Sequence, residues 1–195
     1  MHPGVYAEYE KIAAARNIRG AVLEVGATPD EASLLNLTAL RQASNKIGLN
    51  LQGPADYGDF HILQGDANDM TCFADNRFDA VFCNAVLEHD RYFWKTLDEI
   101  RRVTRPGGLI VIGAPGFANL PYARSMRRLL GRIYPLAHST PTLPVHNYPG
   151  DYYRFSEQAF REVVMAGLQE VEIRSVLAPP RLIGVGIKPA REAPP

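Results

Sequence analysis

Short apolar runs separated by polar turns recur through the first half of the chain. The first run, Ala21–Val25, contains one acid, Glu24, and stops at Gly26. An apolar run that stops at a glycine is typical of a buried parallel strand entering a tight turn. Runs of the same kind predict four more strands, at Lys46–Leu51, Phe60–Leu63, Phe78–Ala85 and Leu109–Gly113.

Helical spacing of apolar residues predicts helices beside these strands. An amphipathic helix is expected from about Val5 to Asn17, and another from Tyr92 to Thr104. Pro29 and Asp30 suit the first turn of a short helix after the glycine. Because strands and helices alternate in this half, we expect an α/β fold with a Rossmann-like, doubly wound and mostly parallel sheet.

The C-terminal end departs from this alternation. Ser156 is a typical helix cap, and the helix that it begins is expected to end near Gly167. Two strand-like runs follow, Val171–Val176 and Leu182–Lys188, with only a short Pro-containing segment between them. A parallel crossover needs about a dozen residues or more. The last two strands are therefore expected to form an antiparallel hairpin.

Composition is that of one compact domain spanning residues 1–195. The chain has 195 residues, 46% hydrophobic and 22% charged, which is enough for one core. Lys+Arg and Asp+Glu are equal at 21 each, so no global field favours nucleic acid or anionic lipid. No apolar run approaches the roughly 20 residues of a membrane helix, and the first residues lack a signal-peptide pattern. We expect a cytoplasmic protein without an integral membrane segment.

The two cysteines, Cys72 and Cys83, form neither a disulfide framework nor a metal-ligand cluster, so free thiols and no metal are expected. Ligands of open α/β sheets lie beyond the carboxyl ends of the strands. There, Glu24 precedes Gly26 and no glycine-rich phosphate cradle follows. This favours a positively charged ligand over a pyrophosphate.

Four motifs occur in one order along the chain. They are LEVGA (Leu23–Ala27), GDAND (Gly65–Asp69), FDAVFCNAVLEH (Phe78–His89) and RRVTRPGGLIVI (Arg101–Ile112). With the expected terminal hairpin, the chain from about Val22 to Lys188 resembles the class I S-adenosylmethionine-dependent methyltransferases, specifically the small single-domain, type 11-like group. The resemblance implies S-adenosyl-L-methionine as cofactor.

The resemblance also implies cofactor-binding residues at the strand ends. The amino-acid end and the sulfonium would lie over Gly26 and Ala27, with Glu24 turned toward the cationic part. Asn84 and Ala85 would face the methionine portion and the transferred methyl. For the nucleoside, the resemblance implies the ribose at Asn50, the adenine flanked by Leu51, its amine bound by Asp66 and a ring nitrogen bound by the amide of Ala67.

Two positions depart from the pattern of that family. Ala27-Thr28-Pro29 replaces the later glycines, and Asn50 stands where the family usually has an acid. The alternative is therefore a catalytically inactive binding or partner protein on the same fold. A nicotinamide oxidoreductase is a third class, against which the terminal hairpin and the missing GxGxxG argue.

Candidate catalytic residues follow the fourth strand and precede the last helix. Methyl transfer needs a base only when the acceptor arrives protonated. His89, beside Glu88 and Asp90, is the first candidate, and a structural role in its loop is the alternative. The dense polar stretch His146–Ser156 adds His146 and Tyr152, with a rigid turn as the alternative.

The long connection Gly116–Pro149 predicts a lid or acceptor insertion at about residues 116–150. It holds a short basic stretch that is either a dock for an anionic partner or a solvated face. We expect methyl transfer to a small-molecule acceptor at a hydroxyl, since no further domain is left to bind a macromolecule. A chain this short could complete its pocket with a second copy, as a homodimer.

Overall fold

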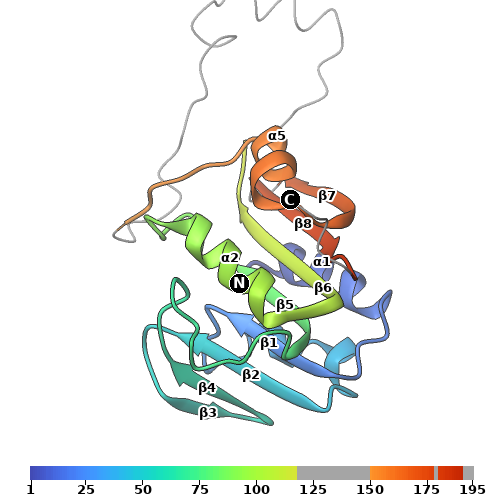
Figure 1. Cartoon of the computed structure of the whole chain (residues 1–195), viewed down its shortest axis with the longest axis vertical. Helices are drawn as coiled ribbons and strands as arrows, with labels where there is room; N and C mark the ends of the chain where they lie inside the picture. The colour runs from blue at the N-terminus through green and yellow to red at the C-terminus, as the bar shows by residue number, and fades with distance from the viewer. Residues whose placement is uncertain (118–149, 178–179, 191–195) are drawn as a thin grey trace, which may run out of the picture.

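The computed structural model describes residues 1–117, 150–177 and 180–190, and the predicted lid at 118–149 lies outside them. The described strands form one eight-stranded sheet in the order β3-β4-β2-β1-β5-β6-β8-β7 (Figure 1). Their bounds are Ala21–Val25 (β1), Asn45–Asn50 (β2), Ala55–Tyr57 (β3), Phe60–Gln64 (β4), Phe78–Asn84 (β5), Thr104–Pro115 (β6), Gln169–Leu177 (β7) and Pro180–Ile187 (β8).

The sheet is parallel in its middle and antiparallel at both edges. Strands β4, β2, β1, β5 and β6 pair in parallel, so their carboxyl ends meet at one edge. At the C-terminal side, β8 runs antiparallel to both β6 and β7. The predicted mostly parallel sheet with an antiparallel C-terminal hairpin is thereby confirmed.

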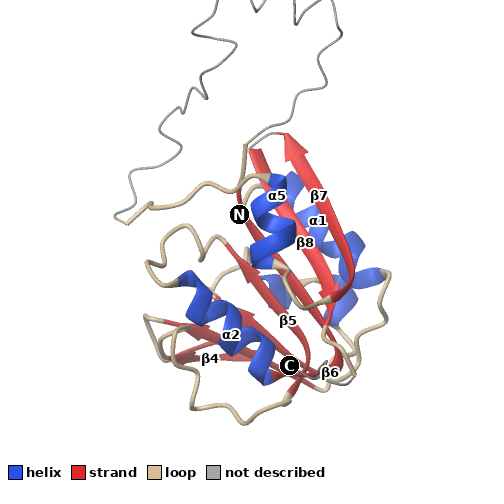
Figure 2. Ribbon diagram, turned by 45° about the horizontal axis from the view of Figure 1, so that its top comes forward, coloured by secondary structure: helices blue, strands red, loops and turns tan. Residues whose placement is uncertain are grey.

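Helices cover both faces of this sheet (Figure 2). Helix α1 (Pro3–Ala14) buries Val5, Tyr9 and Ile12 on one face. On the other face lie α2 (Phe93–Val103) and α5 (Glu157–Ala159), which continues as a π-helical turn, η3 (Phe160–Val164). The sheet is thus the middle layer between two apolar clusters, which explains why its central strands read as nearly continuous apolar runs.

Two connections differ from the predicted alternation. Instead of a short α-helix after Pro29, two 3₁₀ turns form, η1 (Leu34–Asn36) and η2 (Thr38–Leu40). They are separate because Leu37 has an extended ψ of 132°, which interrupts any helix. The fully described segment between β2 and β4 holds no helix either, because β3 pairs antiparallel with β4 there. The strict alternation of strands and helices was therefore a wrong prediction for this half.

Helix α2 is tied to the loop that follows β4 by Arg102. This side chain donates to both carboxylate oxygens of Glu99, at 2.7 Å each, and to the carbonyls of Met70 and Phe73 at 2.9 Å. The loop after β4 therefore has a fixed place beside the sheet edge. In the part of the chain described, no helix has the length and apolarity to cross a membrane.

Candidate functional site

The carboxyl ends of β4, β2, β1 and β5 are joined by direct contacts. Gly26 N donates to Leu49 O at 2.8 Å, and Gly65 N donates to Asn50 O at 2.8 Å. These bonds join the turn after β1 to β2, and β2 to the loop after β4. The structure thus brings the predicted cofactor positions to one edge of the sheet.

Gly26 occupies a position that only glycine fills without strain. Its φ of +84° lies in the left-handed region. A Cβ placed on Gly26 would stand 2.4 Å from Cγ2 of Val86, in the loop after β5. The turn after β1 and the loop after β5 therefore touch at Gly26, with the Val86 side chain lying against the glycine.

Glu24 is buried and bonded within the protein. Its carboxylate accepts from the Ser33 hydroxyl at 2.5 Å and from Leu35 N at 3.4 Å. Burial raises the pKa of Glu24 to about 7, although the Ser33 hydrogen bond acts in the opposite direction. Any contact of Glu24 with a cofactor would therefore come in addition to these bonds with the η1 turn.

Asn50 supports the turn after β1. Its side-chain amide donates to Ala27 O at 2.7 Å, and its Oδ1 accepts from Gln52 N at 3.0 Å. The side chain therefore needs both a donor and an acceptor, which Asn has and an ionised Asp lacks. Leu51, the predicted adenine neighbour, is 69% exposed.

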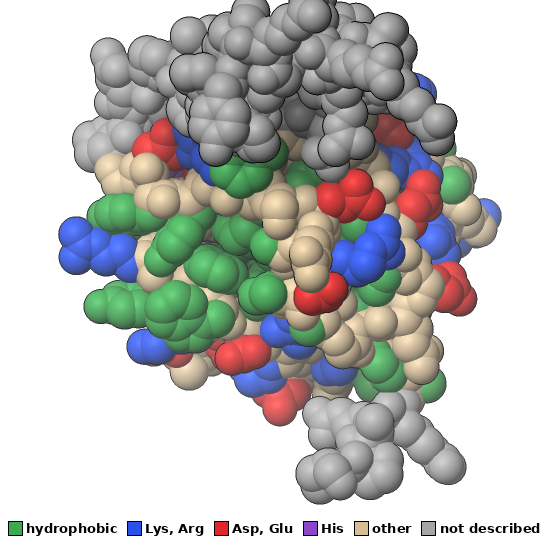
Figure 3. Space-filling model, turned by 90° about the horizontal axis from the view of Figure 1, so that it is seen from above, with side chains coloured by type: hydrophobic (Ala, Val, Ile, Leu, Met, Phe, Trp, Pro, Cys, Tyr) green, Lys and Arg blue, Asp and Glu red, His purple; other side chains and the backbone are tan. Residues whose placement is uncertain are grey.

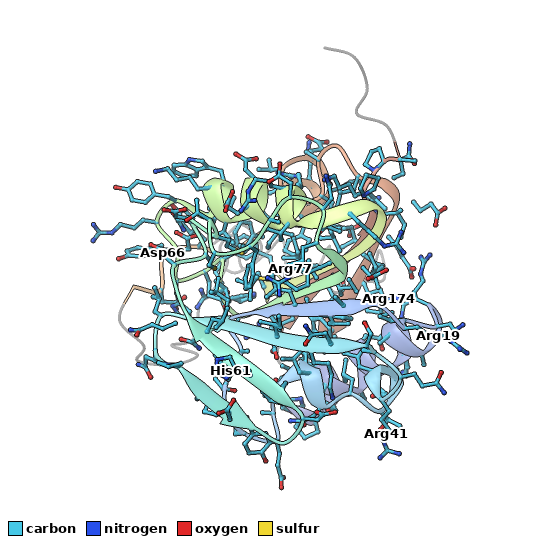
Figure 4. The ribbon with its side chains drawn as sticks, turned by 60° about the horizontal axis from the view of Figure 1, so that its bottom comes forward. Arg19, Arg41, His61, Asp66, Arg77 and Arg174 are labelled. Atoms are coloured by element: carbon cyan, nitrogen blue, oxygen red, sulfur yellow. The ribbon has the colours of Figure 1, made fainter. Side chains whose placement is uncertain are left out.

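Asp66 and Ala67 lie beyond the carboxyl end of β4, away from His61 at its beginning (Figure 4). Asp66 Oδ1 accepts from Asn68 N at 2.9 Å, which closes the turn. Ala67 packs against the apolar cluster that contains α2. The turn that would meet an adenine is therefore held by its own hydrogen bond.

Asn84 ends β5, and its side-chain oxygen lies beside Arg181 and beside the Tyr9 hydroxyl, whose shorter hydrogen bond is to Cys83 O at 3.2 Å. The buried Tyr9 hydroxyl lies 3.5 Å from Oδ1, and Arg181 Nη1 donates to it at 3.2 Å. Ala85 follows with a φ of +59°, so the chain turns sharply after the strand. Neither Tyr9 nor Arg181 is among the site residues that the sequence predicts.

Glu88 is a second residue that the sequence did not identify as functional. Its side chain is fully buried, and neither carboxylate oxygen has a hydrogen-bond partner. Burial raises the pKa of the Glu88 carboxyl, while Arg181 and Arg154 lower it. Its position directly before His89 was the only signal available from the sequence.

The three predicted catalytic residues are placed differently. Tyr152 N donates to Glu88 O at 2.7 Å, which puts the segment of Tyr152 beside the loop of His89. The Tyr152 hydroxyl accepts from Arg91 Nε at 3.0 Å on an exposed surface. His89 is half-buried, and its backbone N–H donates to Val86 O at 2.9 Å. His146 lies outside the described residues.

Aromatic residues surround the start of α2 near this edge. The rings of Tyr92 and Trp94 meet edge to face at 5.7 Å, and both are about half exposed. Arg91 lies over the Tyr152 ring, with 5.3 Å between Cζ and the ring centroid. Hydrophobic side chains gather on the face seen in Figure 3, with lysine and arginine side chains at their margin.

A cavity of about 530 Å³ opens at the other end of the strands. Lys46, His61 and Arg77 line it, and they lie at or just before the beginnings of β2, β4 and β5. Lys46 is paired with Asp59 at 2.5 Å, so part of its charge is neutralised. We place the candidate site at the carboxyl edge, because ligands of parallel α/β sheets bind there.

Comparison with known protein families gives a match over part of the chain. Residues 26–112 match the type 11 methyltransferase domain family. This segment begins at the Gly26 turn and ends within β6, so it contains all but one of the residues predicted to contact the cofactor, the exception being Glu24. No curated protein sequence matches the chain.

Three of the solved structures that share this fold are described here. A chain of the complex between the Haloferax volcanii Trm112 methyltransferase activator and a methyltransferase is 20% identical, with a TM-score of 0.58 and coverage of 96% of this chain and 95% of that one. Burkholderia thailandensis 1,6-didemethyltoxoflavin-N1-methyltransferase, bound to S-adenosylhomocysteine, is 17% identical, with a TM-score of 0.65 and coverage of 95% and 78%.

The third is Haemonchus contortus phosphoethanolamine N-methyltransferase 2 in complex with S-adenosyl-L-methionine. It is 13% identical, with a TM-score of 0.61, and 96% of this chain aligns with it. The present chain spans about half (53%) of that protein's length. At these identities the likeness establishes the fold that the chains share.

Proposed function

We propose that this chain, whose residues 26–112 match the type 11 methyltransferase domain family, is an S-adenosylmethionine-dependent methyltransferase that methylates a small-molecule acceptor. The observation that carries the proposal is the joining of four strand ends by hydrogen bonds and by the Val86–Gly26 contact. When bound, S-adenosylmethionine supplies an activated methyl group. The protein gains rate chiefly by holding the acceptor in line with that methyl.

The residues at this edge fit such a cofactor. Asp66 offers a carboxylate oxygen to an exocyclic amine, while its other oxygen closes the turn. Asn84, whose oxygen is taken by Tyr9 and Arg181, has its amide nitrogen left to donate. Asp66 and Asn84 therefore support the fit of S-adenosylmethionine at this edge. The roles of Gly26, Ala27, Asn50, Leu51, Ala67 and Ala85 remain those that the resemblance implies.

There are two candidates for the atom that accepts the methyl group. A hydroxyl acceptor is the expectation from the sequence, with His89 as the nearest candidate base and Tyr152 beside it. An amine is the second candidate, because two of the similar structures are N-methyltransferases by name. A cytoplasmic location and a homodimer stay predictions, as does the lid at about residues 116–150.

Isothermal titration with S-adenosylmethionine and S-adenosylhomocysteine tests the proposal. We expect micromolar binding of both, and methyl transfer to be detected as S-adenosylhomocysteine release with hydroxyl and amine acceptor panels. Asp66→Ala should weaken cofactor binding more than His89→Ala, because Asp66 is the proposed adenine contact. Asp66→Asn is the matched control, since it keeps an acceptor for Asn68 N. Absence of binding would favour the inactive partner protein.

A further inference from the structure

Arg181 is a mostly buried cation with few hydrogen bonds at the carboxyl edge of the sheet. The register of β8 against β6 places it opposite Pro115, where β6 ends. Its side chain is 15% exposed. Within the described residues, its guanidinium makes one hydrogen bond, to Asn84 Oδ1 at 3.2 Å. A guanidinium has five N–H donors, so most of those on Arg181 have no acceptor in this part of the chain.

Glu88 is the counterion of Arg181 but makes no hydrogen bond with it. Arg181 Nη2 lies 3.8 Å from Glu88 Oε1, which is beyond hydrogen-bond range. The Glu88 side chain is fully buried, and both of its oxygens lack hydrogen-bond partners. Buried ion pairs are stable when their remaining donors and acceptors are bonded. In this pair, N–H donors of Arg181 and both oxygens of Glu88 have no hydrogen-bond partner among the described residues. A further polar group could supply those partners.

The same guanidinium sets the orientation of Asn84. Because Arg181 only donates, the atom of Asn84 that faces it is the oxygen, and the Tyr9 hydroxyl approaches that oxygen too. Gly113 makes room for the arrangement, since a Cβ there would lie 2.2 Å from Tyr9 Oη and 2.7 Å from Asn84 Oδ1. The amide nitrogen of Asn84 and the guanidinium of Arg181 are thus neighbouring donors beside the end of β5.

A ligand with an anionic or zwitterionic group bound at the turn after β1 would need such donors. Ala27 and Leu49 are joined by a hydrogen bond that uses the Ala27 N–H, and Gly26 N is also bonded to Leu49 O. The carboxylate of Glu24 is engaged by Ser33 and Leu35. The backbone amides of Gly26 and Ala27 are therefore already bonded within the protein, so neighbouring side chains are needed as donors to a ligand carboxylate beside them.

We propose that Arg181 binds the α-carboxylate of the amino-acid end of S-adenosylmethionine, together with the amide nitrogen of Asn84. The assignment rests on the proposed function and names a contact that lies outside the matched family segment. Glu88 acts as a positioning residue, whose charge holds the guanidinium in place. A planar guanidinium matches a carboxylate with two parallel N–H···O bonds, which is why arginine suits this role.

Two ligands that differ by the amino-acid end test the assignment. S-adenosylhomocysteine carries the α-carboxylate, whereas 5′-methylthioadenosine has the same nucleoside without it. Titration of Arg181→Met should show roughly 10- to 100-fold weaker binding of S-adenosylhomocysteine, with the affinity for 5′-methylthioadenosine within about twofold. Arg181→Lys keeps the charge but not the two parallel bonds, so its loss should be intermediate.

Arg174→Met is the matched control. Arg174 lies on β7 of the same hairpin and is bonded to Glu8 and Glu172, so both ligands should bind this variant as they bind the wild type. Equal losses of both ligands in Arg181→Met would overturn the assignment in favour of a structural role, and no loss of either would overturn it by showing that Arg181 does not contact the carboxylate. Failure of the wild type to bind S-adenosylhomocysteine would overturn the proposed function and this contact with it. Wild-type binding of S-adenosylhomocysteine that Arg181→Met leaves unchanged would overturn only the contact.

Discussion

The side-chain amide of Asn50 donates to the carbonyl of Ala27 at 2.7 Å, so the residue at the end of β2 holds the turn at the end of β1. The family's usual acid at this position has no proton to give when ionised. Asn50 therefore makes a bond within the protein that an ionised acid at this position could not make.

Asn50→Asp is expected to destabilise the fold by about 1–2 kcal/mol, because a carboxylate would face the Ala27 carbonyl in place of a donor. The loosened turn should also weaken S-adenosylhomocysteine binding. Urea unfolding and titration measure the two effects. Asn36→Asp is the control, since Asn36 donates to Asp30 O at 3.0 Å on an exposed surface away from the strand ends. Tighter binding by Asn50→Asp would contradict the assigned role of the amide.

Gly26→Ala is expected to lower the free energy of unfolding more than Gly167→Ala does. A positive φ alone costs an alanine roughly 1–2 kcal/mol, and the new methyl would also stand 2.4 Å from Val86 Cγ2. Overpacking of this kind adds roughly 1–3 kcal/mol. Gly167→Ala separates the two causes, because Gly167 has a φ of +75° with nothing within 4 Å of the Cβ position. Equal unfolding free energies for the two variants would show that the Val86 contact yields easily.

Glu24 should make stability depend on pH. Its pKa is about 7 in the folded protein against the usual 4.5, so the folded state holds its proton more tightly than the unfolded state. This contribution is present below about pH 4.5 and is lost as the pH rises through 7. Relative to Glu24→Gln, which has no charge to gain, the wild type should lose on the order of 3 kcal/mol between pH 4.5 and 8.

Unfolding free energies of the wild type and Glu24→Gln across that range measure this loss. Ser33→Ala serves as the companion variant, since it removes a hydrogen bond that lowers the Glu24 pKa. Without that bond the folded-state pKa of Glu24 should rise further, so the decline should begin at the same pH, continue to a higher pH and be larger in total. Parallel stability curves for the wild type and Glu24→Gln would show that the carboxyl does not titrate in this range.

Arg102→Ala is expected to lower the unfolding free energy by about 2 kcal/mol or more. The variant loses the Glu99 pair and leaves the carbonyls of Met70 and Phe73 without this donor. Arg161→Ala is the control, because Arg161 and Glu157 form an exposed pair at 3.5 Å, and such pairs contribute roughly 0–1 kcal/mol. Similar losses for both arginines, by thermal or urea unfolding, would contradict a structural role of Arg102.

The strand predictions held because each central strand is buried on both faces. A strand of that kind must be apolar throughout, and the runs at β1, β5 and β6 record this directly. The hairpin was predictable from the length of one connection, since too few residues separate β7 from β8 for a crossover. The 3₁₀ turns after Pro29 were missed because Leu37 interrupts the helix only through its backbone conformation.

Gly26, Asn50, Asp66 and Asn84 were located by sequence because each ends or closely follows a strand, and parallel strands end at one edge. Sequence therefore determined the class of fold, the sheet edge at which the candidate site is proposed and the resemblance to the type 11 methyltransferase domain family that residues 26–112 match. Tertiary structure decided the bonding of each polar group there. Glu88 and Arg181 are far apart along the chain, and only the register of β8 against β6 places them 3.8 Å apart. Local patterns specify which face a side chain takes, whereas contacts across strands depend on how the whole sheet is assembled.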